Sequence, residues 1–384
     1  MTLKSAYMDY QATTPLDERV LASMLPYLTE KFGNPHSAEH RFGWEAEAAL
    51  DVAREQVAGV ISAPSEAITF LSGATEANNL VIKGVMEQWG RNKPHLITVS
   101  TEHKCVLEAA EVCRKAGFRV TLLPVGQDGI IDLNQLEEAI DAETAMVSVM
   151  AVNNEIGIIQ PLSEIGELCR KNGVLFHTDA AQAYGKIPLD VEAMGVDFMS
   201  VSAHKIYGPK GVGALYHKLG KYTTLTPQMH GGGQEGGLRA GTQAPALVAG
   251  LGRAADICAA EMAQEQGRLT TMMNRLVSGL KKSAPALIIN GHPDKRWIGN
   301  LNVSFPGLVG DRLFADIRGL AVSTGAACAS AVAGPSYVLD AIGLSDMDAK
   351  SSLRLGIGRF TTDEEIDFAL DKIAEAIAKQ GGCE

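Results

Sequence analysis

Short apolar runs alternate with longer amphipathic segments through the first two thirds of the chain. Strand-like runs cover residues 67–71, 95–100, 119–123, 145–152, 174–178, 197–201 and 212–216, and helical patterns cover about 74–89 and 104–116. This alternation predicts an α/β fold with a parallel-rich sheet covered by helices on both faces. The runs are almost continuously apolar, which is typical of strands buried on both sides.

The pattern changes after about residue 255. A long helix is expected over roughly 252–283, because apolar positions recur there at helical spacing with few breakers. Strand-like runs follow at 300–305 and 320–323, and a final amphipathic helix is expected at 363–379. The long helix is therefore expected to bridge from a large domain to a smaller one.

Composition excludes several classes of protein. The chain has 384 residues, is 46% hydrophobic, and carries a net charge of −11 with interspersed signs. A direct nucleic-acid binder needs a basic face, so none is expected. No apolar run approaches the roughly 20 residues of a membrane helix, and no signal peptide is visible at the N-terminus.

Cysteine usage points to a reducing compartment. The six cysteines, at 105, 113, 169, 258, 328 and 383, show no CxxC spacing. A disulfide framework and a structural zinc site are therefore not expected, and no metal site is predicted. We expect a cytoplasmic protein.

The most informative segment is a short polar turn after the strand at 197–201. It reads Ser202-Ala203-His204-Lys205 and is followed by Gly208-Pro209-Lys210-Gly211. A desolvated lysine loses its charge and becomes nucleophilic, so Lys205 is a candidate for Schiff-base formation. Most lysines have no such role, and Lys205 alone is weak evidence.

A strand-end acid strengthens the interpretation of Lys205. Asp179 follows the apolar run at 174–178 and would lie at the same carboxyl edge of the sheet. A carboxylate for a pyridinium nitrogen and a Schiff-base lysine are what pyridoxal phosphate requires. Taken alone, Asp179 could equally be the N-cap of a helix that begins at Ala180.

Several further side chains are candidates for cofactor contacts. Ala74 and Thr75 open a helix after a strand, where backbone N–H groups attract a phosphate, although an ordinary capped helix is the alternative. His103 could stack on a pyridine ring and carry a proton, or be a surface histidine. The amides of Asn154 and Gln182 could each donate to a phenolic oxygen.

Two more residues suggest substrate chemistry. Cys328 lies in a run of small residues, Gly325-Ala-Ala-Cys-Ala-Ser-Ala331, that reads as a mobile loop, although such a cysteine is often part of a core. Cys105, at a helix start, is the rival thiol, because a helix N-terminus can lower a thiol pKa. Arg354 is a candidate clamp for an α-carboxylate, with a structural ion pair as the alternative.

These motifs, in this order, resemble those of class V, fold-type I pyridoxal phosphate enzymes, and among them the cysteine desulfurases of the NifS/IscS type. The resemblance runs from Met8-Asp-Tyr-Gln-Ala-Thr-Thr-Pro15 to Arg359-Phe-Thr-Thr362. It implies a seven-stranded mixed sheet in a large domain, residues 15–255. It also implies a smaller α+β domain built from residues 1–14 and 256–384.

The resemblance also implies roles for individual residues. Ser202 and His204 would help to bind the phosphate, and Thr242 would reach the phosphate of the other subunit of a homodimer. Lys205 would hold the cofactor and remove the Cα proton of L-cysteine, and Arg354 and Asn154 would hold the substrate carboxylate. Cys328 would take the sulfur as a persulfide for a protein acceptor. Iron–sulfur assembly, tRNA thiolation and DNA phosphorothioation are all compatible with such a scaffold.

Departures from the family pattern and rival functions remain. Gly236 replaces the usual arginine, and the loop Thr324-Gly-Ala-Ala-Cys-Ala-Ser330 lacks the usual hydroxyls. The C-terminal extension used for scaffold docking is not expected. A selenocysteine lyase or class V aminotransferase is the nearest rival, and a non-catalytic sulfur-transfer partner is a more distant one.

Overall fold

The computed structural model describes residues 5–220, 224–324 and 336–381. Its largest sheet has seven strands in the order β2-β8-β7-β6-β5-β3-β4. Only β8 runs against the others, so the sheet is mixed and parallel-rich, as predicted. The strands are β2 (Ile68–Leu71), β3 (His95–Val99), β4 (Arg119–Leu123), β5 (Thr144–Ser148), β6 (Leu175–Asp179), β7 (Phe198–Ser202) and β8 (Gly213–His217).

Alternate side chains of these strands enter two different cores. Leu96 and Met146 pack with α3 and α4, whereas their neighbours Ile97 and Val147 pack with α2 and α7. Because successive strand residues point to opposite faces, both faces must be apolar, which explains the continuous apolar runs. The helices of this part are α1 (Glu18–Thr29), α2 (Arg41–Gly59), α3 (Ala74–Trp89), α4 (Lys104–Lys115), α5 (Leu133–Ala139), α6 (Leu162–Asn172) and α7 (Pro245–Ser283).

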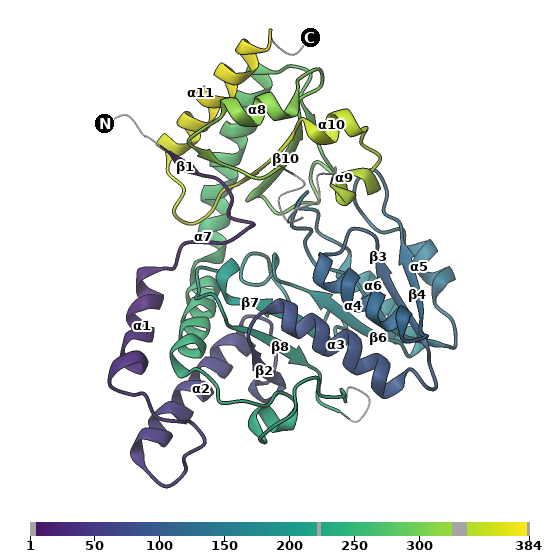
Figure 1. Cartoon of the computed structure of the whole chain (residues 1–384), viewed down its shortest axis with the longest axis vertical. Helices are drawn as coiled ribbons and strands as arrows, with labels where there is room; N and C mark the ends of the chain where they lie inside the picture. Colours follow the sequence, from purple (N-terminus) through teal and green to yellow (C-terminus); the bar gives the residue numbers. More distant parts are fainter. Residues whose placement is uncertain (1–4, 221–223, 325–335, 382–384) are drawn as a thin grey trace.

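The long helix α7 begins at Pro245, seven residues before the predicted start at Gly252. Proline suits the first turn of a helix, where its missing N–H costs nothing. Gly252 instead lies inside α7, because a Cβ there would come within 2.6 Å of the Ala53 Cα on α2. The glycine marks close helix packing rather than a helix end, and α7 runs from the seven-stranded sheet toward α11 (Figure 1).

The remaining elements form a smaller α+β unit. A three-stranded antiparallel sheet has the order β12-β10-β9, and a parallel pair joins β1 with β11. The elements are β1 (Ala6–Tyr7), β9 (Ile288–Ile289), β10 (Asn300–Ser304), α8 (Gly310–Asp316), β11 (Leu320–Ala321), α9 (Tyr337–Ala341), α10 (Asp346–Lys350), β12 (Ser352–Gly356) and α11 (Asp363–Lys379). Helix α11 begins with a capping box between Thr362 and Glu365.

The two ends of the chain lie together in this smaller unit. Strand β1 pairs with β11, and Asp9 bridges to Gly356 at the end of β12. Figure 1 shows β1 beside α11. We propose residues 15–255 as the large domain, and residues 1–14 with 256–384 as the small one.

Candidate active site

The carboxyl ends of the parallel strands border a cavity of about 550 Å³. Such an edge is where open α/β sheets place their ligands. Loops after β2, β3, β5, β6 and β7 all contribute side chains to it, as does the N-terminal segment at Gln11–Thr13. Ten predicted site residues line this cavity: Ala74, Thr75, His103, Asn154, Asp179, Gln182, Ser202, His204, Lys205 and Arg354.

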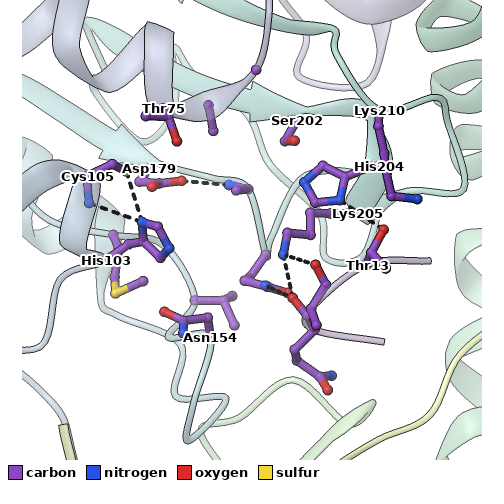
Figure 2. Close-up of a pocket in the computed structure, with 18 of the residues that line it drawn as sticks. Thr13, Thr75, His103, Cys105, Asn154, Asp179, Ser202, His204, Lys205 and Lys210 are labelled. Atoms are coloured by element: carbon purple, nitrogen blue, oxygen red, sulfur yellow. Dashed lines mark hydrogen bonds between the residues drawn. The ribbon is translucent and has the colours of Figure 1, made fainter. Parts of the chain in front are cut away.

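Lys205 ends a short 3₁₀ turn, η2 (Ala203–Lys205), directly after β7. Its Nζ donates to the backbone oxygens of Gln11 and Ala12, at 2.5 and 2.8 Å. Figure 2 shows this side chain extending into the cavity from the side of His204. The N-terminal segment is therefore part of the wall around the lysine, which sequence reasoning did not foresee.

Asp179 is the last residue of β6 and is 5% exposed. Its Oδ2 accepts a hydrogen bond from Asn78 Nδ2 at 2.7 Å, and its Oδ1 accepts from the N–H of Ala181 at 2.9 Å. The carboxylate is thus fixed from both sides in a buried setting. Asn78 was missed, although it lies in the helix that the sequence already linked to phosphate binding.

His103 caps α4 and lies beside the rival thiol. Its Nδ1 is 3.0 Å from Cys105 Sγ and accepts from the backbone N–H of Cys105. Burial lowers the pKa of His103, Lys205 acts in the same direction, and Asp179 opposes them. The imidazole is therefore disposed to be neutral, which suits ring stacking and proton transfer.

The position of Cys105 at a helix start does not make its thiol reactive. Burial raises the pKa of its thiol to about 12, and the negative charge of Asp179 adds to this effect. The Asn78 amide also donates to the sulfur at 3.1 Å. A thiol with such a pKa holds its proton at neutral pH and is a poor nucleophile.

The end of the cavity at the N-terminus of α3 is suited to a phosphate group. Gly73 precedes α3 with φ of 155°, and a Cβ there would meet nothing within 4 Å, so open space lies in front of the helix N-terminus. Thr75 and Ser202 line that space, and Figure 2 shows them on the same side. Backbone N–H groups at a helix start and hydroxyls are the usual ligands of phosphate.

His204 borders the same end. Its Nδ1 is 3.1 Å from the Thr13 hydroxyl. Burial lowers the pKa of His204 to about 4, with further lowering by Lys205, Lys210 and Lys186. A neutral imidazole here can still offer one N–H donor to an anion.

Two buried amides face the middle of the cavity. Asn154 is 7% exposed, and its Oδ1 has no hydrogen-bond partner. Gln182 is 4% exposed and donates from Nε2 to the Gln11 backbone oxygen at 2.8 Å. A buried polar atom without a partner is costly, so Asn154 has spare bonding capacity for a bound group. Each amide carries an NH₂ donor beside its acceptor oxygen, and with Asp179 and Lys205 the two amides fit pyridoxal phosphate.

Arg354 lies on β12, 3% exposed, where the smaller unit meets the cavity. Its Nη2 pairs with Asp9 Oδ1 at 2.7 Å and donates to Ser323 Oγ, and its Nη1 donates to the Asn154 backbone oxygen. The alternative interpretation as an ion pair is thus realised. Nε nevertheless has no partner, so the guanidinium keeps capacity for a second anion.

Two predicted site residues are not placed in this cavity. Thr242 is exposed and does not line it. Cys328 lies in 325–335, outside the described residues. The loop positions that lack the usual hydroxyl groups lie there too. Gly236 has φ of 64°, a conformation that disfavours the arginine usual there.

Two buried glutamates near the cavity were also missed by sequence reasoning. Glu102 is fully buried, and burial with the nearby Asp179 charge raises its pKa well above the usual value. Glu155 is buried too, and burial raises its pKa to about 7 despite a hydrogen bond from Ser336. The signal was their position beside His103 and Asn154.

Other kinds of site find little support in the part of the chain that the structure describes. Across residues 5–220, 224–324 and 336–381, no group of three or more His, Cys, Asp or Glu side chains could hold a metal ion. None of the helices described there is long and apolar enough to cross a membrane.

Comparison with known proteins agrees with this geometry. The profile of the family "Aminotransferase class-V" matches residues 6–368. "Cysteine desulfurase IscS" of Rickettsia rickettsii (strain Iowa) is 50% identical over 373 residues, which cover 97% of this chain and 91% of that protein.

Two solved structures extend the comparison. A "NIFS-LIKE PROTEIN" superposes with a TM-score of 0.90 at 37% identity, covering 98% of this chain and 100% of that one. The structure named "SspA in complex with cysteine" superposes with a TM-score of 0.84 at 37% identity, covering 93% and 100%. The chain belongs to the class V aminotransferase family and, within it, to the pyridoxal phosphate-dependent cysteine desulfurases.

Proposed function

We propose that this desulfurase converts L-cysteine to L-alanine in the cavity around Lys205 and passes the sulfur on through a persulfide on Cys328. The observation that carries the proposal is that Lys205, Asp179 and Arg354 line one cavity, although they come from β12 and two separate strand ends of the larger sheet. A similar structure was solved with cysteine bound, which supports cysteine as the substrate here.

Pyridoxal phosphate, when bound, supplies a protonated ring that withdraws electrons from the substrate Cα. Asp179 holds a proton at the ring nitrogen, because its carboxylate is buried and fixed by Asn78 and the Ala181 N–H. Thr75, Ser202 and the start of α3 bind the phosphate group.

Lys205 holds the cofactor and then serves as the base that removes the Cα proton. Its Nζ lies against the Gln11 and Ala12 carbonyl oxygens, which would stabilise the ammonium form once the lysine has taken up the Cα proton. His103, whose pKa burial lowers, carries a proton at the same face. The amides of Asn154 and Gln182 would donate to the phenolic oxygen of a bound cofactor.

Arg354 binds the substrate carboxylate. It is buried, keeps an unpartnered Nε, and lies beside Asn154, which it contacts through the Asn154 backbone oxygen. Asp9 already neutralises part of its charge at 2.7 Å. The pair holds the guanidinium in place at the cavity wall, where it can bind a carboxylate.

The transfer of sulfur requires only the substrate and one enzyme thiol, with no external oxidant. The Cys328 thiolate attacks the substrate sulfur, the new S–S bond forms, and the Cβ–S bond breaks with its electrons left on carbon. One proton added at Cβ and one returned to Cα by Lys205 then complete L-alanine, and the enzyme carries a persulfide. Cys328 is assigned from the sequence, since it lies outside the described residues.

The active unit is a homodimer. Thr242 is exposed and lies outside the cavity of its own chain, so it is available to a second subunit. Nearby, Leu28, Phe32 and Trp44 are 57%, 69% and 55% exposed, which is unusual for large apolar side chains. His36 contacts Gln243 at 3.0 Å, which brings this apolar face next to Thr242.

The sulfur acceptor is a protein in the cytoplasm. Iron–sulfur assembly, tRNA thiolation and DNA phosphorothioation each remain as destinations, and the surface distinguishes none of them. A selenocysteine lyase or an aminotransferase is the rival activity. An aminotransferase needs a keto acid and does not need Cys328.

A single-turnover assay tests the proposal. The purified enzyme is mixed with L-cysteine, and alanine and protein-bound persulfide are measured together, with selenocysteine as a second substrate. Equal amounts of both products, with the persulfide on Cys328, are expected. Lys205→Ala should abolish turnover, whereas Cys328→Ser should keep the cofactor and lose desulfuration. Cys113→Ala, in the core of α4, is the matched control. Normal sulfide release by Cys328→Ser would refute the assignment.

A further inference from the structure

A buried lysine contacts the back of the cavity wall. Lys186 lies four residues after Gln182 and is 8% exposed. Its Nζ donates to Gln182 Oε1 at 3.1 Å and lies 4.5 Å from the centre of the Trp297 ring. Lys186 does not line the cavity, and the proposed mechanism does not use it.

A chain of hydrogen bonds connects this lysine to Lys205. Gln182 accepts from Lys186 at Oε1 and donates from Nε2 to the Gln11 backbone oxygen at 2.8 Å. The same oxygen accepts from Lys205 Nζ at 2.5 Å. Two lysines are thus joined through one amide and one carbonyl oxygen, in a largely buried region.

The orientation of the Gln182 amide follows from the chemistry of its neighbours. The ammonium of Lys186 can only donate, so the amide oxygen faces it, and the Gln11 carbonyl oxygen can only accept, so it requires the NH₂ group on its side. The NH₂ group must then face Gln11 and the cavity, where its second hydrogen is available. Reversal would place donor against donor at Lys186 and acceptor against acceptor at Gln11.

We propose that Lys186 is a positioning residue that fixes the Gln182 amide with its NH₂ group toward the cofactor. The inference rests on the proposed role of Gln182 as a donor to the phenolic oxygen of the cofactor. That oxygen accepts hydrogen bonds, and a flipped amide would present a repelling oxygen instead. Lys186 therefore acts on the cofactor through Gln182, without touching it.

The charge of Lys186 also bears on Lys205. Burial lowers the pKa of Lys186 to about 7, and the charge of Lys205 acts in the same direction, while Cys258 and Glu265 oppose it. Such coupling is reciprocal, so a charge on Lys186 favours the neutral form of the group at Lys205. The face of the Trp297 ring offsets part of the cost of the buried charge.

A purely structural role would be served better by another side chain. A methionine has nearly the same length, would pack on Trp297, and would avoid the cost of burying an amine. The lysine is the less stable choice at this position, and its side chain donates a hydrogen bond to a cavity residue.

The test compares Lys186→Met with Lys186→Gln in the holoenzyme. Two properties are measured: the rate of cofactor release, and the pH at which the absorbance of the bound cofactor changes. Lys186→Met should release the cofactor about tenfold faster, as expected for one lost buried hydrogen bond, and should move the absorbance change to higher pH. Lys186→Gln keeps a hydrogen-bond donor without a charge. It should therefore restore slow release of the cofactor, but the absorbance change should stay at the higher pH.

Two further variants sharpen the result. Adding Lys186→Met to Gln182→Met should speed release no further, because the effect runs through Gln182. Lys171→Met is the matched control, since its side chain is 66% exposed on α6 and pairs only with Glu137 on the surface.

The proposal is overturned if Lys186→Met lowers thermal stability while cofactor release and the absorbance pH stay at wild-type values. A further increase in release in the Gln182→Met background would also overturn it. Failure of the proposed function looks different: the wild type and Lys171→Met would then form no alanine from L-cysteine. The two cofactor measurements still decide the role of Lys186 in that case.

Discussion

The Asn78 side chain donates a 2.7 Å hydrogen bond to Asp179, and so joins helix α3 to the end of strand β6 at the cavity. Both side chains are buried. The same amide nitrogen also donates to Cys105 Sγ at 3.1 Å. One asparagine therefore fixes the carboxylate and also donates a hydrogen bond to the thiol beside it.

Asn78→Leu should weaken cofactor binding. The substitution keeps the branching and the number of side-chain heavy atoms but removes the donor to a buried carboxylate, and a hydrogen bond to a charged group contributes about 1.5–3 kcal/mol. Cofactor affinity should fall by roughly 10- to 100-fold, since 1.4 kcal/mol is a factor of ten. Titration of the apoenzyme with pyridoxal phosphate measures this, and Asn172→Ala, at the exposed end of α6, is the control. Unchanged affinity would show that Asp179 does not need Asn78.

Cys105 should remain unreactive in the folded enzyme. Burial raises the pKa of its thiol to about 12, so almost none of it is ionised at about pH 8. Iodoacetamide at that pH, followed by peptide mass spectrometry, should leave Cys105 unlabelled. After reaction with L-cysteine, no persulfide should be found on it. Rapid labelling in the native state, with full labelling in urea as the reference, would contradict the high pKa.

A buried ion pair should make stability depend on pH. Arg54 binds both oxygens of Glu235, at 2.9 and 3.0 Å, and the Glu235 side chain is 1% exposed. Burial raises the pKa of Glu235, but the hydrogen bonds and charge of Arg54, with Gln243 and the Phe70 N–H, outweigh it, so the pKa is lowered. The stabilisation is therefore present above the unfolded pKa, about 4.3, and is lost as the pH falls through the folded pKa.

Arg54→Met should lower the free energy of unfolding by about 3–5 kcal/mol at neutral pH, because it leaves a buried charge without its partner. The difference from wild type should shrink as the pH falls, first when Glu235 takes up a proton in the variant, where burial raises its pKa, and fully once it does so in wild type, below the ordinary pKa. Urea unfolding at several pH values measures it. Arg41→Met is the control, because Arg41 is 82% exposed and its pair with Glu45 should contribute under about 1 kcal/mol. A pH-independent difference would rule out the ion pair as its source.

The strands and helices around the cavity could be predicted because local patterns determine them. Helices α3 and α11 have the predicted bounds, and Lys205 and Asp179 follow strands whose apolar runs are unambiguous. The start of α7 could not be predicted, because Gly252 owes its place to contact with α2, a relation between distant segments.

Contacts across the sequence account for what was missed in the site. The Gln11 carbonyl oxygen receives Lys205 over 194 residues, and Lys186 reaches the cavity only through Gln182. Neither residue type signals such a role by itself. The high thiol pKa of Cys105 also depends on burial and on Asp179, which a helix-terminus argument ignores.

Thr242 provides the sharpest test of a shared active site. It is exposed and outside the cavity of its own chain. If it serves the partner's phosphate, Thr242→Ala on one chain and Lys205→Ala on the other damage the same cavity of a mixed dimer. One cavity then carries both substitutions, and the other carries neither. The second cavity should work normally, because one chain supplies an unchanged Lys205 and the other supplies an unchanged Thr242.

Co-expression of the two variants under separate affinity tags gives the mixed dimer. At random pairing, about half of the dimers are mixed, so about a quarter of all cavities should be intact. Purified mixed dimers should therefore show about half the wild-type rate of alanine formation and a cofactor bound as tightly as in wild type. If Thr242 acts within its own chain, each cavity of the mixed dimer is damaged. The mixed dimer would then show no more than half the rate of Thr242→Ala alone, and its cofactor would dissociate as readily as from that variant.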